Sequence, residues 1–370
     1  MANEVQMVSR TTNKMTGWLA ALLVVAFGCE SAASRQASDS GSAPGDDGGK
    51  DLAAARADSA SGAGAEASTG GSTGACSPGP CADGVGNVVV LFGGEDKTGQ
   101  MADTWEGDGK TWTEHDVPGP GPRSGAAMAS LHGKVVLFGG VDGTKALADT
   151  WEWDGSAWTL RASSLPTSGI PARWGHAMAT LGDRVVLFGG ANGIQSFGDT
   201  WEWDGAAWFE RVVSGPEARF GHAMAALSGK VVLVGGSYDL ATVGDDTWEW
   251  DGTAWTLRTG SSPGPHQSHA LATLGDKIVL VGGGFNDWWQ WDGNTWTQIG
   301  APGPSARMNP AMASLVGKVV LFGGSDGFTE LGDTWNWDGT AWVQYGVYGA
   351  GTSGPAGRDR HAMAARRRSQ

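Results

Sequence analysis

The sequence predicts an all-β fold, a six-bladed β-propeller, from three observations. First, the apolar phrase VVLFGG or a close variant occurs six times, at intervals of 41 to 50 residues, which is the period of propeller blades (89–94, 135–140, 185–190, 231–236, 278–283 and 319–324). Second, Gly (62) and Trp (20) are far above ordinary usage among the 370 residues, as expected for short strands, tight turns and large packed rings. Third, each of the four kinds of strand segment occurs six times, and the incomplete first and last copies of the repeat complement each other.

Each repeat contains four extended segments, and their composition changes along the repeat. The first segment (HAMATL) is built of small residues, and the second (VVLFGG) is apolar on both faces, as in a strand buried on both sides. The third (DTWEW) and fourth (AWTL) carry the tryptophans and are joined by Asp-Gly, a strong turn signal. Small residues followed by large ones predict a sheet that widens from a crowded centre to a broad rim, which is the wedge shape of a propeller blade.

The two ends of the repeat region complement each other. The first copy (88–113) has no small-residue strand before it, and the last such strand, RHAMAA (360–365), has no apolar strand after it. We therefore expect six four-stranded blades, with the C-terminal strand completing the first blade and leaving no exposed sheet edges at the closure. The alternative is a seventh blade cut short, for example by a frameshift that produced ARRRSQ.

These repeats resemble the kelch repeat, in which a paired glycine ends an apolar strand and is followed by D-x-W and a further Trp after a short turn. The resemblance covers roughly residues 87–365. It implies a propeller, but it says little about activity, because kelch propellers include adhesive scaffolds, substrate adaptors and a few enzymes. A copper radical oxidase, one enzyme of this fold, needs a Tyr-Cys pair, and the repeat region contains no Cys. No cofactor or metal is expected.

The residues before the repeats resemble an exported bacterial lipoprotein. Arg10 and Lys14 precede an apolar run (17–28) that fits a signal-peptide core and falls short of a membrane span. The stretch AFGC then resembles a lipobox, which makes Cys29 the expected lipidated residue; the alternative is an ordinary signal peptide cut near Ala32–Ala33. The expected location is the periplasm, the outer membrane or the cell surface, with the lipid as the only membrane contact.

The chain is thus divided into a signal peptide (1–28), a disordered tether rich in Ala, Ser, Gly and Asp (29–82), the propeller (83–365) and a basic tail (366–370). Cys76 and Cys81 flank a Pro-Gly-Pro turn, so a small disulfide is expected in an oxidising compartment, with two reduced thiols as the alternative. The net charge of −14 and the lack of a basic footprint argue against a nucleic-acid partner. A monomer is expected.

Most tryptophans recur at matching positions, so we expect them to form the core between blades. Trp174 and the doubled Trp288–Trp289 break the pattern and are the better candidates for exposed stacking. Four histidines at equivalent positions of the first strand are interpreted as packing residues spread around a ring (His176, His222, His269 and His361).

The start of the first strand carries the strongest candidate ligand site. A cationic residue recurs there and would surround the central channel, where guanidinium groups could clamp a carboxylate, a sulfate or an acidic loop. The candidate ligand-binding residues are Arg123, Arg173, Trp174, Arg219, His266, Arg307 and Arg358. The alternative is that aspartates opening the third strand, on the same face, absorb these charges in ion pairs (Asp149, Asp199, Asp246 and Asp333).

The loops on this face differ between repeats while the strands barely change, and variable loops on a rigid scaffold are where recognition usually occurs. The fifth repeat has only a stub (284–286) where the others have a loop of about eight residues, which predicts a notch in the rim. The leading hypothesis is a tethered, non-enzymatic scaffold that binds a protein or a glycan, an acidic one included, through this face. The alternatives are an enzyme acting on an acidic sugar, similar to N-acetylneuraminate epimerase, with Glu95, Glu217 and Glu330 as available carboxylates, and a passive envelope protein.

Overall fold

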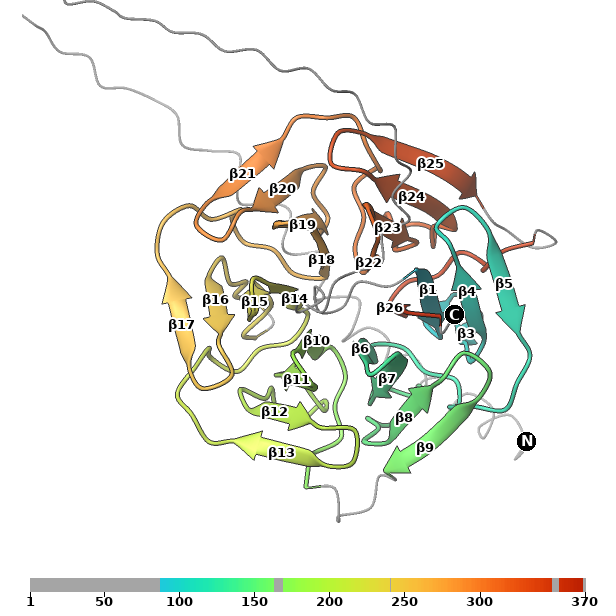
Figure 1. Cartoon of the computed structure of the whole chain (residues 1–370), viewed down its shortest axis with the longest axis horizontal. Coiled ribbons are helices and arrows are strands. Elements are labelled where there is room, and N and C mark those ends of the chain that lie inside the picture. The colour runs from blue at the N-terminus through green and yellow to red at the C-terminus, as the bar shows by residue number, and fades with distance from the viewer. Residues whose placement is uncertain (1–86, 163–168, 240, 348–352, 369–370) are drawn as a thin grey trace, which may run out of the picture. The chain divides into compact units, whose positions relative to one another are not determined.

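The computed structural model describes residues 87–162, 169–239, 241–347 and 353–368. Six four-stranded antiparallel sheets are arranged around a central axis (Figure 1). The six-bladed, all-β prediction is therefore confirmed. The expected signal peptide, the expected tether and the three cysteines Cys29, Cys76 and Cys81 lie outside the described residues. Among those that are described, no helix is long and apolar enough to cross a membrane.

The four strands of each blade occupy equivalent positions from the axis to the rim. The innermost strands are β26 (Ala362–Arg366), β6 (Ala127–Leu131), β10 (Ala177–Leu181), β14 (Ala223–Leu227), β18 (His269–Leu274) and β22 (Ala311–Leu315). The second strands are β1 (Val88–Phe92), β7 (Lys134–Phe138), β11 (Arg184–Phe188), β15 (Lys230–Val234), β19 (Lys277–Gly282) and β23 (Lys318–Phe322).

The third strands are β4 (Thr104–Gly107), β8 (Thr150–Trp153), β12 (Thr200–Trp203), β16 (Thr247–Trp250), β20 (Trp288–Trp291) and β24 (Asp333–Trp337). The outermost strands are β5 (Trp112–His115), β9 (Trp158–Ala162), β13 (Trp208–Arg211), β17 (Trp255–Arg258), β21 (Trp296–Ile299) and β25 (Trp342–Val347). A small hairpin, β2 (Glu95–Asp96) with β3 (Gly99–Gln100), lies in the first loop. We number the blades in the chain order of their second strands, so that blade one contains β1 and blade six contains β23.

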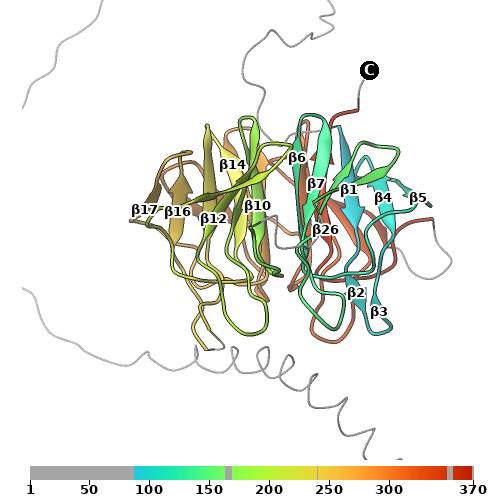
Figure 2. The ribbon, with the colours of Figure 1, turned by 90° about the horizontal axis from the view of Figure 1, so that it is seen from below.

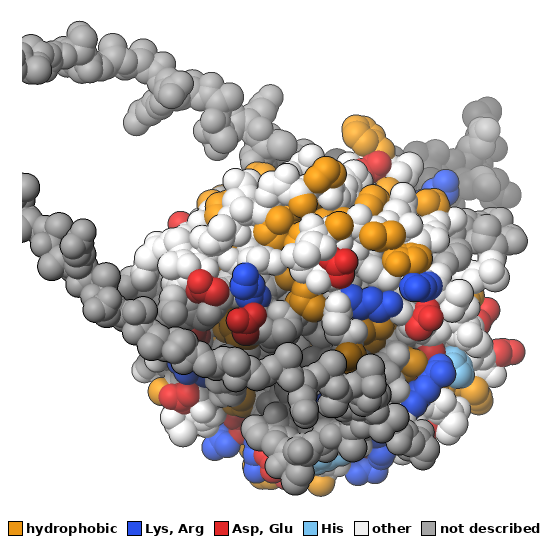
Figure 3. All heavy atoms as spheres, turned by 45° about the horizontal axis from the view of Figure 1, so that its top comes forward, with side chains coloured by type: hydrophobic (Ala, Val, Ile, Leu, Met, Phe, Trp, Pro, Cys, Tyr) orange, Lys and Arg blue, Asp and Glu red, His pale blue; other side chains and the backbone are white. Residues whose placement is uncertain are grey.

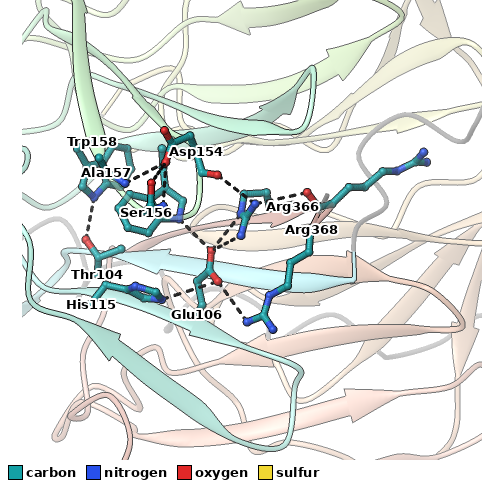
Figure 4. Close-up of polar contacts among 11 residues, drawn as sticks. Thr104, Glu106, His115, Asp154, Ser156, Ala157, Trp158, Arg366 and Arg368 are labelled. Atoms are coloured by element: carbon teal, nitrogen blue, oxygen red, sulfur yellow. Dashed lines mark hydrogen bonds and ion pairs between the residues drawn. The ribbon is translucent and has the colours of Figure 1, made fainter. Parts of the chain in front are cut away.

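The C-terminal strand closes the ring, as predicted. β26 pairs antiparallel with β1, from Val88 opposite Arg366 to Phe92 opposite Ala362. The basic tail takes part in this closure, because β26 itself ends at Arg366. Arg366 Nε donates to Oε1 of the buried Glu106 at 3.0 Å, and Arg368 contacts Oε2 of the same carboxylate at 3.3 Å (Figure 4). We call these contacts of Arg366 and Arg368 with Glu106 the clasp of blade one.

The repeated tryptophans hold neighbouring blades together. In five blades, the Trp that opens the outermost strand donates its indole N–H to a Thr of the third strand of the preceding blade, as Trp158 does to Thr104 Oγ1 at 2.8 Å (Figure 4). The second Trp of most third strands is fully buried, and Trp153 is one example. Between these strands, the Asp of the turn accepts hydrogen bonds from the backbone N–H groups two and three residues on, as Asp154 does from Ser156 and Ala157. The recurring tryptophans and the Asp-Gly turns are thus structural.

Both ends of the blades are visible in the side view. The longer connections, including β2 and β3, lie at the bottom of Figure 2, and we call this side the loop face. The innermost strands enclose a narrow channel of about 130 Å³, lined by their Met, Leu, Ala, Ser and Thr side chains. The channel is too narrow to be the main ligand site, since small-molecule sites commonly measure ~300–1,000 Å³.

Candidate functional site

The arginines that precede the innermost strands are buried and paired with aspartates. Arg173 is 0% exposed, and its Nη1 and Nη2 contact the two carboxylate oxygens of Asp199 at 2.6 and 2.8 Å. Nη1 also donates to the carbonyl of Gly189, and Nε donates to the carbonyl of Pro171. The same bidentate pairing holds the other four arginines (Arg123–Asp149, Arg219–Asp246, Arg307–Asp333 and Arg358–Asp103).

These bonds explain the D-x-W motif. Each aspartate that opens a third strand also accepts the indole N–H of the Trp two residues on, at 2.7 Å between Trp151 Nε1 and Asp149 Oδ2. The guanidinium group beside it keeps the pKa of Asp149 below its usual value despite burial, which on its own raises it. Of the two interpretations of the arginine ring, ion pairing is the arrangement in the structure. The guanidinium groups tie the starts of the first and third strands to the end of the second.

Blade five departs from this arrangement. His266 replaces the arginine, is buried, and hydrogen-bonds through Nδ1 to the carbonyl oxygen of Gly264 at 3.1 Å. Its Nε2 lies 3.6 Å from Asp287 Oδ1, and neither atom has a hydrogen-bond partner. Phe285 packs on the imidazole, with the ring centroids 4.9 Å apart.

Directly after the arginines, the chain forms the mouth of the channel on the loop face. The second residue after each Arg or His has a positive φ, and its N–H donates to the carbonyl of its equivalent in a neighbouring blade. Six such hydrogen bonds form a closed ring (Gly125 to Arg360, Arg360 to Asn309, Asn309 to Ser268, Ser268 to Gly221, Gly221 to Gly175 and Gly175 to Gly125). Three of the six positions carry a side chain in this left-handed conformation, which costs each of them about 1 kcal/mol relative to glycine.

The side chains around this ring differ from blade to blade. We call them the mouth residues: the pairs Ser124–Gly125, Trp174–Gly175, Phe220–Gly221, Gln267–Ser268, Met308–Asn309 and Asp359–Arg360. One side is aromatic, because Trp174 and Phe220 are both half-buried and pack edge to face with centroids 5.5 Å apart. The mouth is therefore asymmetric on a nearly symmetric ring.

The opposite side of the mouth is a polar network at the ring closure. Glu95 pairs with the exposed Arg360 at 2.7 Å, and its Oε2 accepts hydrogen bonds from Ser124 and Gln100. Asp359 lies opposite Glu95 across an antiparallel backbone bridge and accepts a bond from Asn309 Nδ2 at 3.2 Å. Two neighbouring, partly buried carboxylates thus have different partners: Glu95 pairs with Arg360, whereas Asp359 accepts a hydrogen bond from Asn309.

Burial raises the pKa of Asp359 to about 6, and the neighbouring Glu95 charge adds to this, against the attraction of Arg360. Because the folded pKa is higher than the unfolded one, the folded state binds the proton more tightly. This carboxyl group therefore removes stability as pH rises from about 4 through 6.

We expect Asp359→Asn to stabilise the protein by about 2 kcal/mol at about pH 8, and to have little effect at about pH 3, where the carboxyl is mostly protonated in both the folded and the unfolded state. Urea unfolding at the two pH values measures this difference. A substitution effect that is the same at both would show that Asp359 ionises normally.

The remaining predicted residues have clear positions. The four histidines of the innermost strands are buried, and burial lowers the pKa of His222 and His361 to about 3, with the neighbouring arginines adding to the effect. They are packing residues, as expected; His176, for example, meets Phe138 of the preceding blade edge to face. The expectation that Trp288 stacks on the surface is wrong: it is 4% exposed, because it takes the position of the Thr in other blades and fills the space between blades five and six.

The sequence analysis singled out Trp174 and Glu95 but missed Phe220, Asn309, Asp359 and Arg360. A signal for them was present. The two residues after the arginine read SG, WG, FG, MN and DR in five blades, and QS follows His266 in the other, whereas the flanking residues barely change. Among the described residues, no group of three His, Cys, Asp or Glu side chains could hold a metal ion.

Two family models match the chain. A model described as the KLHDC2/KLHL20/DRC7 Kelch-repeats domain matches residues 67–236, and a Kelch motif model matches residues 218–264. A search of curated proteins finds no match. The two matches together span residues 67–264, which include the strands from β1 to β17. Residues 67–264 are therefore similar to kelch repeats, and the described residues fold as a six-bladed β-propeller.

Proposed function

We propose that this protein is a non-enzymatic binding scaffold that takes a protein or glycan ligand at the mouth residues and the loops around them. One observation carries the proposal: the residues that hold the blades together are the same in nearly every blade, whereas the mouth residues form six different pairs. A rigid ring that presents different side chains at one opening has the form of a recognition site.

The chemistry of the mouth limits the ligand. Trp174 and Phe220 offer a stacking surface for a sugar ring or an apolar side chain, and aromatic residues dominate binding energy at interfaces. Across the opening, Glu95, Asp359 and Arg360 supply both signs of charge. Since the framework arginines are buried, Arg360 is the cation that would meet an acidic group of the ligand.

The test measures binding of the full chain to a glycan array and to a peptide array. The measurement is then repeated with the Trp174→Ser variant. Blade two has Ser124 at the equivalent position, so this substitution suits the fold. We expect affinity for the array ligands to fall about 30-fold or more, which corresponds to about 2 kcal/mol, with the melting temperature nearly unchanged. Phe209→Ser is the matched control, because Phe209 is exposed on the outermost strand β13, away from the mouth. Equal losses in both variants, or none in either, would exclude the mouth as the site.

The same proposal includes a membrane tether. The AFGC sequence supports lipidation at Cys29, and residues 30–82 would then hold the propeller away from the bilayer. Metabolic labelling with a fatty acid should mark the full chain and fail to mark Cys29→Ser. Label that persists in the variant would place any lipid elsewhere.

One observation favours catalysis on an acidic sugar as a second candidate. Asp359 has a pKa raised by burial and lies beside Glu95, which forms an ion pair with Arg360, and a carboxyl group with a raised pKa next to a second carboxyl group is typical of acid–base pairs. NMR of N-acetylneuraminic acid with the full chain would show anomer exchange or epimerisation faster than in buffer. Binding without any turnover supports the scaffold.

A further inference from the structure

The loop-face end of blade five contains a hollow that the repeat pattern does not explain. Its volume is about 580 Å³, within the ~300–1,000 Å³ of small-molecule sites. It lies where the loop after β19 is shortened to a stub, so the predicted notch in the rim is present. The hollow is lined by Asn286, Asp287 and Trp288 from the start of β20 and by residues 298–303 from the end of β21 and the segment after it.

Three repeated features are replaced together at this end of the blade. His266 stands in place of the arginine, Trp288 in place of the threonine, and three residues in place of a loop of about eight. The replacements leave buried polar atoms without partners, because Trp342 Nε1 lacks the Thr hydroxyl that its equivalents use and Asp287 Oδ1 lacks a guanidinium. Such losses cost stability, about 1–3 kcal/mol for each buried unpaired group. Local departures from a repeat that weaken the fold are expected at functional positions.

The lining of the notch has a definite chemical character. Asn286 and Gln298 are exposed, and each amide both donates and accepts hydrogen bonds. Asp287 is the one charged side chain of the lining, and one of its oxygens is held by Trp289 Nε1 at 2.8 Å. Ile299 and Pro302 add apolar contact surface. Figure 3 shows hydrophobic side chains gathered on the outer rim at the top of Figure 1, with charged side chains between them.

We propose that the notch of blade five binds a neutral saccharide. Each sugar hydroxyl both donates and accepts, which matches two amides and a carboxylate, and the C–H faces of the ring match Ile299 and Pro302. The single negative charge disfavours anionic sugars, in contrast to the mouth, where Arg360 is exposed. A peptide is less suited, because Trp288 and Trp342 are buried with Gly303 packed against them, so these rings offer little surface to an anchoring apolar side chain. The notch and the mouth share no lining residue, so separate substitutions test the two sites.

The experiment uses the full chain and saturation-transfer difference NMR with the methyl glycosides of glucose, galactose and mannose. We expect a saturable signal from at least one of them and none from N-acetylneuraminic acid at this site. Asn286→Ala and Gln298→Ala should each weaken binding about five- to tenfold, the effect of one lost hydrogen bond. Gln344→Ala is the matched control, because Gln344 faces Trp335 in blade six as Gln298 faces Trp289 in blade five.

A second variant fills the notch with a loop of the usual length, which also removes Asn286 but keeps Asp287 and Gln298. Replacing residues 284–286 with the blade-six loop, residues 325–332, should abolish the signal while the protein stays folded and Trp174-dependent binding at the mouth persists. The proposal is overturned if no neutral glycoside binds saturably, if only a peptide binds there, or if binding survives both the amide substitutions and the loop replacement.

Discussion

Removing residues 358–370 is expected to lower the free energy of unfolding by more than about 5 kcal/mol and the melting temperature by more than about 10 °C. The deletion takes away β26 and so exposes the edge of β1. It also leaves two partly or fully buried carboxylates without their cations: Asp103 loses Arg358, and Glu106 loses Arg366 and Arg368. Thermal unfolding followed by circular dichroism measures the effect.

Two further variants separate the strand from the clasp. A chain ending at Arg368 keeps every closing contact described here and should melt like the full chain. Arg366→Ala keeps the strand and removes one partner of Glu106, so an intermediate loss is expected. If the chain without residues 358–370 melts at the same temperature as the full chain, the ring is not held closed by its C-terminal strand.

Replacing a framework arginine is expected to have the second largest effect. Arg173→Ala should cost about 3–5 kcal/mol, because Asp199 would keep its charge in a mostly enclosed position without its bidentate partner. The loss should exceed that of Lys145→Ala, an exposed position where a change of less than about 0.5 kcal/mol is expected. Equilibrium unfolding in urea compares the two.

The double variant Arg173→Ala with Asp199→Ala tests the reason for that loss. If the unpaired carboxylate is the cause, removing it restores part of the stability, and the two substitutions are not additive. Arg173→His copies blade five and should be milder than Arg173→Ala, since His266 occupies the equivalent position in the native fold. Equal effects of Arg173→Ala and Lys145→Ala would mean that the arginine contributes little to the framework.

The fold could be predicted from the sequence because the same strand and turn residues recur in six repeats. The period predicted the number of blades, and the change from small to large side chains predicted their wedge shape. The two incomplete ends predicted that the C-terminal strand closes the ring. The clasp of Arg366 and Arg368 on Glu106 was not predictable, because ARRRSQ has no equivalent elsewhere in the chain and looked like a tail.

The candidate site was harder to predict, for a physical reason. The sequence placed Arg173 and Asp199 on one face of the propeller. It could not show whether the guanidinium group of Arg173 is buried against the Asp199 carboxylate or exposed to a ligand. Trp288 looked like an exposed extra ring because the sequence shows that it replaces a threonine but does not show that this position lies between two blades. The pairing of Glu95 with Arg360 joins residues 265 positions apart and depends on the closure itself.

The most direct measurement is the binding of a variant whose mouth is made uniform. In this variant every blade carries Ser-Gly after the Arg or His, as Ser124–Gly125 do in blade two, while the Arg–Asp pairs and tryptophans are kept. The melting temperature should stay the same or rise, because three left-handed non-glycine residues and the enclosed Asp359 are relieved. We predict that this folded variant loses the Trp174-dependent array binding of the native chain. Native affinity in the folded uniform variant would contradict the conclusion that the mouth residues, and not the repeated framework, carry the function.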